Sequence, residues 1–279
     1  AAHPCSRALG ESPLDPSLSA CIMRVGRPHE PCHSRPERSV SALSIVPLGV
    51  GDAFSVRWYS SCLLIETEGE RLLVDCPHPI RKILSEGTAG RVDLGDISGV
   101  VLTHLHADHA SGLEGFAYFV RFALGRRAQL VLHPSVQARL WEGHLAAGME
   151  MLGDSPMQLE DYFDLTALDL DRPVRFGKFE IACRTTRHPI PTTALRISAG
   201  GREIGISSDT SFDPELIEWL GHSDLIVHET NLGIHTPYEE LARLPAELRS
   251  RMRLTHFPDD FDGDASVIAV LEQGVRVVV

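Results

Sequence analysis

Residues 103–112 read Thr-His-Leu-His-Ala-Asp-His-Ala-Ser-Gly and place four metal-capable side chains within six positions: His104, His106, Asp108 and His109. Neutral imidazole nitrogens and carboxylate oxygens are ligands that suit zinc, manganese or iron. Histidine accounts for 14 of the 279 residues, so this ordered cluster should arise by chance in about one of several hundred such chains. We interpret the stretch as a metal site, and its alternating ligands predict two neighbouring ions.

The sequence around this stretch predicts rigid elements on both sides of it. Residues 97–102 form a short apolar run that is typical of a buried strand, and its C-terminal end leads directly into the cluster. After the cluster, residues 116–124 are expected to form a helix. Ligands at such a junction are held firmly while the loop stays accessible, which favours chemistry over metal storage.

The first 42 residues differ in composition from the rest of the chain. Prolines are scattered among Ser, Arg and Cys, and no hydrophobic periodicity is sustained. We expect a poorly ordered extension over 1–42 and a single hydrolase-like domain over 43–279. Cys5, Cys21 and Cys32 match no common zinc-finger spacing, so whether they bind a metal stays open.

From residue 43 onward, strands and helices alternate in a pattern typical of an α+β fold. Two mixed sheets flanked by helices, an αββα sandwich, would accommodate this order. The expected strands are 44–48, 54–59, 62–66, 71–75, 97–102, 129–133, 179–187, 193–198, 203–207, 224–228, 252–255 and 275–279. The expected helices are 80–85, 116–124, 214–220, 238–249 and 265–272, and residues 135–168 are expected to be mostly helical.

Four further polar residues follow predicted strands in the second half: His188, Asp209, His228 and His256. One histidine at a strand end is usually only a solvated side chain. Four of them in one fold indicate a common edge at which the strands present potential ligands.

Charge and hydropathy narrow the functional classes. The chain carries 38 acidic and 26 basic residues, a formal net charge of −12, which argues against a general grip on nucleic acid or anionic membrane. No apolar run approaches the roughly 18 residues that a membrane span needs, and no signal-peptide pattern opens the chain. Without a Cys-x-x-Cys pair, Cys62, Cys76 and Cys183 are expected to be free and buried. We expect a cytoplasmic protein.

On these motifs the chain resembles the metallo-β-lactamase superfamily, and more closely its tRNase Z-like phosphodiesterase branch. Residues 71–75 resemble the strand that supplies the family's orienting aspartate. Residues 227–230, Val-His-Glu-Thr, resemble the HEAT signature without its alanine, and residues 254–257 resemble the segment of the last ligand histidine. Enzymes of this kind include cyclic-nucleotide phosphodiesterases, among them the anti-Pycsar type, and a cyclic-phosphate phosphodiesterase of phosphonate use.

The resemblance implies a role for each matching residue. It places His104, His106 and His188 on a first ion, Asp108, His109 and His256 on a second, and Asp209 between the two. Asp75 would orient the metal loop without touching an ion. His228, backed by Glu229, would donate a proton. His133, His235 and Tyr238 are weaker candidates for substrate contacts.

The implied cofactors are two divalent ions, zinc foremost and manganese or iron as alternatives. Two ions about 3.5 to 4 Å apart can hold a hydroxide at neutral pH and clamp a phosphoryl or acyl oxygen. The two oxygens of Asp209 can reach both ions, whereas one imidazole cannot. An alkoxide leaving group needs a proton, which a histidine can supply.

The sequence therefore predicts a dinuclear metal-dependent hydrolase, most simply a phosphodiesterase that cleaves a small phosphodiester such as a cyclic nucleotide. A lactone or thioester hydrolase on the same ions is the main alternative. A tRNA-processing endonuclease is disfavoured by the charge and by the lack of a long Gly/Pro/Lys arm in residues 129–173. An iron oxygenase is disfavoured because it needs fewer ligands. A homodimer is the expected oligomer.

Overall fold

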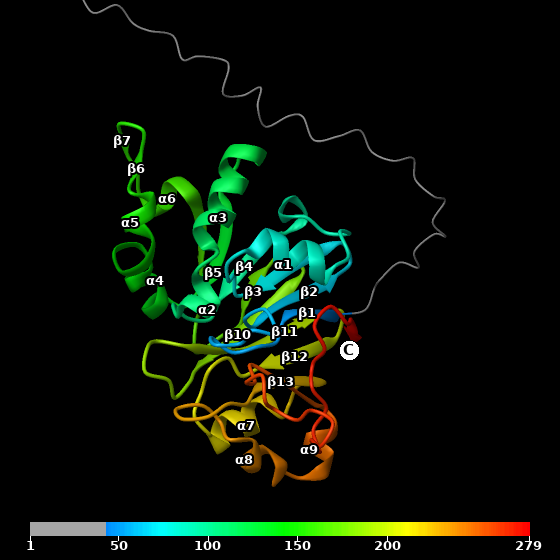
Figure 1. Cartoon of the computed structure of the whole chain (residues 1–279). Coiled ribbons are helices and arrows are strands. Elements are labelled where there is room, and N and C mark those ends of the chain that lie inside the picture. The colour runs from blue at the N-terminus through cyan, green and yellow to red at the C-terminus, as the bar shows by residue number, and fades with distance from the viewer. Residues whose placement is uncertain (1–42) are drawn as a thin grey trace, which may run out of the picture. The chain divides into compact units, whose positions relative to one another are not determined.

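The computed structural model describes residues 43–279, and the elements below belong to this part of the chain (Figure 1). The predictions for residues 1–42, including those for Cys5, Cys21 and Cys32, lie outside the described residues. The domain boundary at residue 42 therefore stays a prediction.

One mixed sheet carries seven strands in the order β15-β1-β2-β3-β4-β5-β8. Strands β3, β4, β5 and β8 run parallel to one another, so their carboxyl ends meet at one edge. The strands are β1 (Ser44–Gly49), β2 (Cys62–Thr67), β3 (Glu70–Val74), β4 (Gly99–Leu102), β5 (Ala128–Leu132), β8 (Phe163–Ala167) and β15 (Val277–Val278).

The second sheet has six strands in the order β14-β13-β12-β11-β10-β9. Strands β9 to β12 form an antiparallel meander, whereas β12, β13 and β14 are parallel. The strands are β9 (Val174–Phe176), β10 (Phe179–Thr185), β11 (Thr193–Ala199), β12 (Arg202–Ile206), β13 (Leu225–Glu229) and β14 (Met252–Thr255).

Helices cover the outer faces of both sheets, as Figure 1 shows for α1 and α3 on one side and for α7 to α9 on the other. The helices are α1 (Ile80–Gly87), α2 (Ala107–Ala110), α3 (Leu113–Tyr118), α4 (Pro134–Leu140), α5 (Ala146–Met149), α6 (Leu159–Tyr162), α7 (Pro214–Leu220), α8 (Tyr238–Ala242) and α9 (Ala246–Ser250). A short hairpin, β6 (Met151–Leu152) with β7 (Ser155–Pro156), projects between α5 and α6.

The middle of the first sheet is buried on both faces, which explains why β4 reads as a continuous apolar run. On β4, Val101 packs into a cluster shared with Ile181 and Ile206 of the second sheet. Its neighbours Val100 and Leu102 face the opposite way, into a cluster shared with helices α1 and α3. These two layers of core make the predicted αββα sandwich.

Two predicted elements are wrong because long-range contacts override local pattern. Residues 54–59 do not form a strand, because the side chain of Asp259 holds Ser55, Val56 and Arg57 in a loop. Residues 265–272 do not form a helix. Their backbone pairs with the free edge of β14 through hydrogen bonds from Leu254 N to the carbonyl of Ala269 and from Leu271 N to the carbonyl of Leu254.

Other boundaries differ for local reasons. The helix predicted over 238–249 is two helices, α8 and α9, because Pro245 lacks the N–H that a continuous helix requires. Residues 135–168, expected to be mostly helical, also contain the hairpin β6-β7 and the strand β8. Strand β8 lies at the edge of the sheet, where it pairs with β5. Because an edge strand is partly exposed, it carries polar residues such as Asp164 and lacks the apolar run that indicates a strand.

The three cysteines in the described part of the chain, Cys62, Cys76 and Cys183, are free and buried, as predicted. Burial raises the pKa of each thiol, and that of Cys183 to about 11, so all three behave as small apolar groups. Among residues 43–279, the helices are too short or too polar for a bilayer span.

Candidate metal centre

The carboxyl ends of strands from both sheets converge on one group of imidazoles and carboxylates. The loop after β4 contributes four side chains, and the loops after β10, β12 and β14 contribute one each. The seven candidate ligands are His104, His106, Asp108, His109, His188, Asp209 and His256. Polar residues at the ends of parallel strands meet at a common edge, as the sequence indicated.

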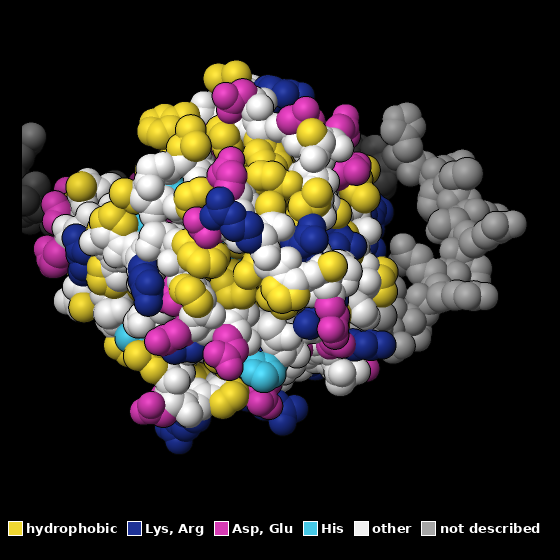
Figure 2. Space-filling model, turned by 90° about the horizontal axis from the view of Figure 1, so that it is seen from below, with side chains coloured by type: hydrophobic (Ala, Val, Ile, Leu, Met, Phe, Trp, Pro, Cys, Tyr) yellow, Lys and Arg dark blue, Asp and Glu magenta, His cyan; other side chains and the backbone are white. Residues whose placement is uncertain are grey.

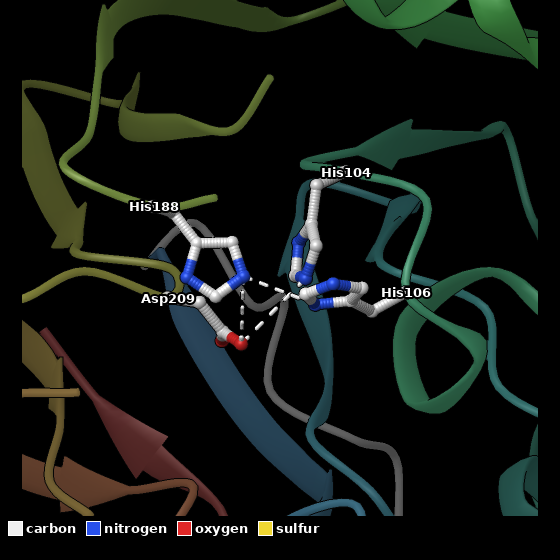
Figure 3. Close-up of side chains that lie close together, drawn as sticks. All are labelled: His104, His106, His188 and Asp209. Atoms are coloured by element: carbon white, nitrogen blue, oxygen red, sulfur yellow. Dashed lines mark hydrogen bonds and ion pairs between the residues drawn. The ribbon is translucent and has the colours of Figure 1, made fainter. Parts of the chain in front are cut away.

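The first cluster joins three histidines and one aspartate (Figure 3). His188 Nε2 lies 3.0 Å from His106 Nδ1. Asp209 Oδ2 lies 3.6 Å from His104 Nε2 and 3.9 Å from His188 Nε2. All four ligand atoms fall within 4.8 Å of one another.

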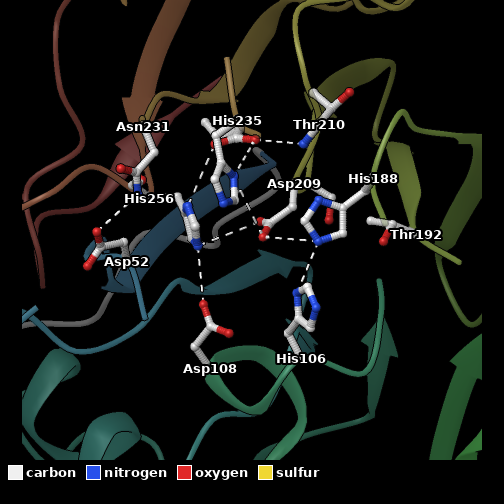
Figure 4. A network of polar contacts seen from close by, with 12 residues as sticks. Asp52, His106, Asp108, His188, Thr192, Asp209, Thr210, Asn231, His235 and His256 are labelled. Carbon is white, nitrogen blue, oxygen red and sulfur yellow. Dashed lines mark hydrogen bonds and ion pairs between the residues drawn. The ribbon is translucent and has the colours of Figure 1, made fainter. Parts of the chain in front are cut away.

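The second cluster lies on the other side of Asp209 (Figure 4). Asp108 Oδ2 is 3.4 Å from His109 Nε2 and 3.2 Å from His256 Nε2. Asp209 Oδ1 is 3.3 Å from His109 Nε2 and 3.7 Å from His256 Nε2. One aspartate thus turns a different oxygen toward each cluster, which is the geometry of a bridging ligand.

The spacing and the burial of these donors fit a metal ion in each cluster. Nitrogen and oxygen ligands about 2.1 Å from a tetrahedral zinc lie about 3.4 Å apart, close to most of the separations above. The Nε2 atoms of His104 and His109 are buried and have no hydrogen-bond partner within residues 43–279. Buried polar atoms are almost always satisfied, so these two nitrogens fit the role of metal ligands.

Asp75 contacts both ends of the metal loop through its side chain. It follows β3, and its Oδ1 accepts hydrogen bonds from the backbone N–H (2.8 Å) and the hydroxyl (2.9 Å) of Thr103. Its Oδ2 lies 2.7 Å from Nδ1 of His109 and so turns Nε2 of that ring toward the second cluster. Gly112 lets the loop close against the chain after Asp75, because a Cβ there would lie 2.5 Å from the carbonyl oxygen of Pro77.

The backbone is strained at three strand ends around the centre. Asp75, Ser208 and His256 have φ angles of 64°, 51° and 55°. The left-handed conformation costs a residue with a side chain about 1–2 kcal/mol. His256 is itself a ligand candidate, Asp75 orients the ring of His109, and Ser208 precedes Asp209, so the strain lies where ligands are aimed.

The charge states of the candidate ligands favour cation binding. Burial opposes the charge of Asp209, but His109 and His256 hold its pKa well below the usual range. Burial lowers the pKa of His188 to about 4, which keeps that ring neutral, as a ligand must be. Burial also opposes charge on His256, yet Asp209, Asp108 and Glu229 raise its pKa to about 10. The carboxylates around His256 therefore favour a positive charge at this position, which either a proton or a metal cation would supply.

Glu229 and His235 form a pair beside both clusters. Glu229 Oε1 accepts a hydrogen bond from the N–H of Thr210 (2.6 Å) and lies 2.9 Å from Nδ1 of His235. The His235 ring centroid lies 5.1 Å from that of His256 and 5.7 Å from that of His188, so the ring lies beside a member of each cluster. Burial would lower the pKa of His235, but Glu229 raises it. The pair can hold and release a proton.

His228, the predicted proton donor, lies apart from the candidate ligands. Successive residues of a strand face opposite sides, so Glu229 points to the centre and His228 points away. His228 is 1% exposed, and its Nδ1 lies 2.7 Å from the carbonyl oxygen of Glu229. The sequence alone predicts for His235 no more than a substrate contact. The alternation along β13, which faces only one of residues 228 and 229 toward the edge, was the available signal.

The remaining candidates lie away from the ligands. His133 follows β5 and caps helix α4, where its Nδ1 accepts a hydrogen bond from the N–H of Ser135. The Tyr238 hydroxyl accepts a hydrogen bond from Val267 N–H, and its ring packs against Phe261. Within residues 43–279, neither side chain has a polar contact with a candidate ligand, so their predicted substrate contacts are not supported.

Comparisons with known proteins are consistent with this geometry. Residues 43–274 match the family model described as anti-Pycsar protein Apyc1. The chain is 31% identical to an anti-Pycsar protein Apyc1 from Saccharibacillus brassicae over 84% of this chain and 98% of that protein.

Solved structures agree with the fold. The metallo-β-lactamase fold protein YhfI from Bacillus subtilis superposes with a TM-score of 0.69 at 18% identity, over 85% of this chain and 99% of that one. The short form of human tRNase Z superposes with a TM-score of 0.62 at 21% identity, over 84% and 98% of the two chains. The predicted metallo-β-lactamase fold is confirmed.

Proposed function

The chain belongs to the anti-Pycsar protein Apyc1 family, and on that premise we propose that it is a metal-dependent phosphodiesterase that cleaves a cyclic nucleotide. The observation that carries the proposal is the Glu229–His235 pair beside two ligand clusters that share Asp209. Hydrolysis of an unactivated phosphodiester needs both a clamp for the phosphoryl group and a proton for the leaving alkoxide.

We propose the same ligand assignment that the family resemblance implies. His104, His106 and His188 would hold one ion, Asp108, His109 and His256 the other, and Asp209 would touch both. Zinc is the foremost candidate, with manganese or iron as alternatives, because the donor set is nitrogen and oxygen only. Two such ions activate water at neutral pH and neutralise charge on the phosphoryl oxygens.

We assign the proton donor to His235 in place of His228. Its Nδ1 is engaged with Glu229 Oε1, so Nε2 is the ring nitrogen left to face a substrate. Glu229 raises the pKa of His235, which favours the protonated ring that a general acid requires. The backbone N–H of Thr210 also donates a hydrogen bond to Oε1 of Glu229, so the carboxylate has a defined orientation toward His235.

Charge favours a small substrate over a polynucleotide. The net charge is −12, and the face formed by α7 to α9 in Figure 2 mixes basic, acidic and hydrophobic side chains, with no broad basic area. Residues 151–156, in the region where a tRNA-gripping arm would be expected, form only the short hairpin β6-β7. A polyanion binder relies on clustered lysines and arginines.

A substrate panel tests the proposal. Chelator-stripped protein reloaded with zinc or with manganese is offered a 3′,5′-cyclic mononucleotide, a linear phosphodiester, a lactone and a thioester. We expect the highest kcat/KM on the cyclic nucleotide and no turnover by the stripped protein. Higher kcat/KM on the lactone or the thioester would contradict the proposal and favour a carboxyl-ester hydrolase on the same ligands.

A further inference from the structure

Two loops beside the metal centre present large hydrophobic side chains to solvent. Phe54 and Val56, between β1 and β2, are 88% and 92% exposed, and Leu232 and Ile234, after β13, are 75% and 52% exposed. We call these four residues the apolar lip. Single exposed hydrophobic residues are ordinary, whereas several gathered at a functional centre mark a binding surface.

Side-chain hydrogen bonds join the two loops into one unit. Asp52 Oδ1 accepts a hydrogen bond from Phe54 N–H (2.9 Å), and its Oδ2 accepts one from the Asn231 side-chain amide (3.0 Å). The side-chain oxygen Oδ1 of Asn231 in turn accepts a hydrogen bond from Leu232 N–H (2.7 Å). The hydrogen bond between Asp52 and Asn231 therefore connects the two loops that carry the apolar lip.

The same pair ties the lip to the metal centre. The Asn231 amide also donates to the backbone carbonyl of His256, 3.3 Å away, and Figure 4 shows Asp52 and Asn231 beside that ligand candidate. Ile234 directly precedes His235, the proposed proton donor. A substrate whose phosphate lies at the clusters would thus have the lip next to it.

The exposure of Phe54 and Val56 is built into the fold. Asp259 accepts hydrogen bonds from the Ser55 hydroxyl, from Val56 N–H (2.8 Å) and from Arg57 N–H (3.3 Å). Those contacts hold the loop in one conformation and lower the pKa of Asp259. A phenyl ring that is held in water gains none of the free energy that its burial would provide. A ligand that covers the ring would provide that burial.

We propose that the apolar lip binds the base of the nucleotide, with the ring of Phe54 as its stacking surface. This inference rests on the proposed function. It assigns a binding surface to the base, which the metal ligands do not contact. A nucleobase has flat apolar faces that stack on aromatic and aliphatic side chains. Phe54, Val56, Leu232 and Ile234 carry no polar side-chain atom, so the lip fits that part of the substrate and not its phosphate.

The test compares a cyclic nucleotide with 1-O-methylribose 3,5-cyclic phosphate, which keeps the cyclic phosphodiester and lacks the base. Stacking of one base corresponds to a factor of about 5 to 150 in binding. Phe54→Ala should therefore lower kcat/KM on the cyclic nucleotide by about that factor, mainly through KM, and leave the base-free substrate unchanged. Phe54→Tyr should retain most of the native value.

Phe122→Ala is the matched control, because Phe122 is also an exposed phenylalanine (54%) and lies outside the lip. It should change neither substrate. Equal kcat/KM of the native protein on both substrates would overturn the lip proposal alone, and so would equal losses with Phe54→Ala. Hydrolysis of neither substrate would overturn the proposed function as well. A dimer that dissociates in the Phe54→Ala variant without a kinetic change would make the lip an interface between copies and overturn its binding of a base.

Discussion

Asp209→Ala is expected to remove most metal from both ion positions and to lower phosphodiester hydrolysis by about 10³-fold or more. Asp209 is the one candidate ligand that faces both clusters, with Oδ2 toward His104 and Oδ1 toward His109. Two bound ions supply several kcal/mol of charge stabilisation to the reaction. Elemental analysis of the purified variant, beside kcat/KM on a cyclic nucleotide, measures both effects.

Asp75→Ala is the comparison for that variant. Asp75 contacts Thr103 and His109 and no second ligand, so its loss should weaken metal binding by about 10- to 100-fold without emptying both positions at high metal concentration. His188→Ala should lose metal from one position only. If Asp209→Ala keeps one full equivalent of metal while Asp75→Ala keeps none, Asp209 is not a bridge.

His235→Ala is expected to slow cleavage of a cyclic nucleotide by about 10²- to 10⁴-fold while metal content stays at the native level. The physical reason is the leaving group. A ribose alkoxide must be protonated as it departs, whereas a 4-nitrophenolate leaves without a proton. The variant should therefore be far less impaired on an activated 4-nitrophenyl phosphodiester. The measurement is the ratio of the two losses in kcat.

His228→Ala is the matched histidine control. His228 is buried and points away from the centre, so its removal should lower stability without a preference for one leaving group. A leaving-group dependence in His228→Ala and none in His235→Ala would restore the assignment that the structure displaced. Loss of metal from His235→Ala would instead make His235 a ligand, as its place near Asp209 and His256 allows.

The convergence of the seven candidate ligands could be predicted because its signals are local. Residues 103–112 carry four ligand candidates in one turn of chain, and the others each follow a short apolar strand. Parallel strands that end at one edge bring such residues together whatever the details of packing. The roles of His228 and Glu229 were harder, because only the orientation of β13 in its sheet decides which of two neighbours faces the centre.

The elements that could not be predicted depend on distant partners. The apolar residues 265–272 match a helix locally, but the free edge of β14 offers backbone hydrogen bonds to Ala269 and Leu271. Residues 54–59 alternate like a strand, but Asp259, about 200 positions away, binds three of them. The exposure of Phe54 and Val56 follows from that contact, and no pattern within the loop reveals it.

A metal titration of catalysis measures how many ions the centre needs. Chelator-stripped protein receives increasing equivalents of zinc or manganese, and the initial rate of cyclic-nucleotide hydrolysis is recorded at each step. We expect a rise that levels off at about two equivalents per chain, since the two candidate ligand clusters share Asp209. A plateau at one equivalent, or full hydrolysis without added metal, would contradict it.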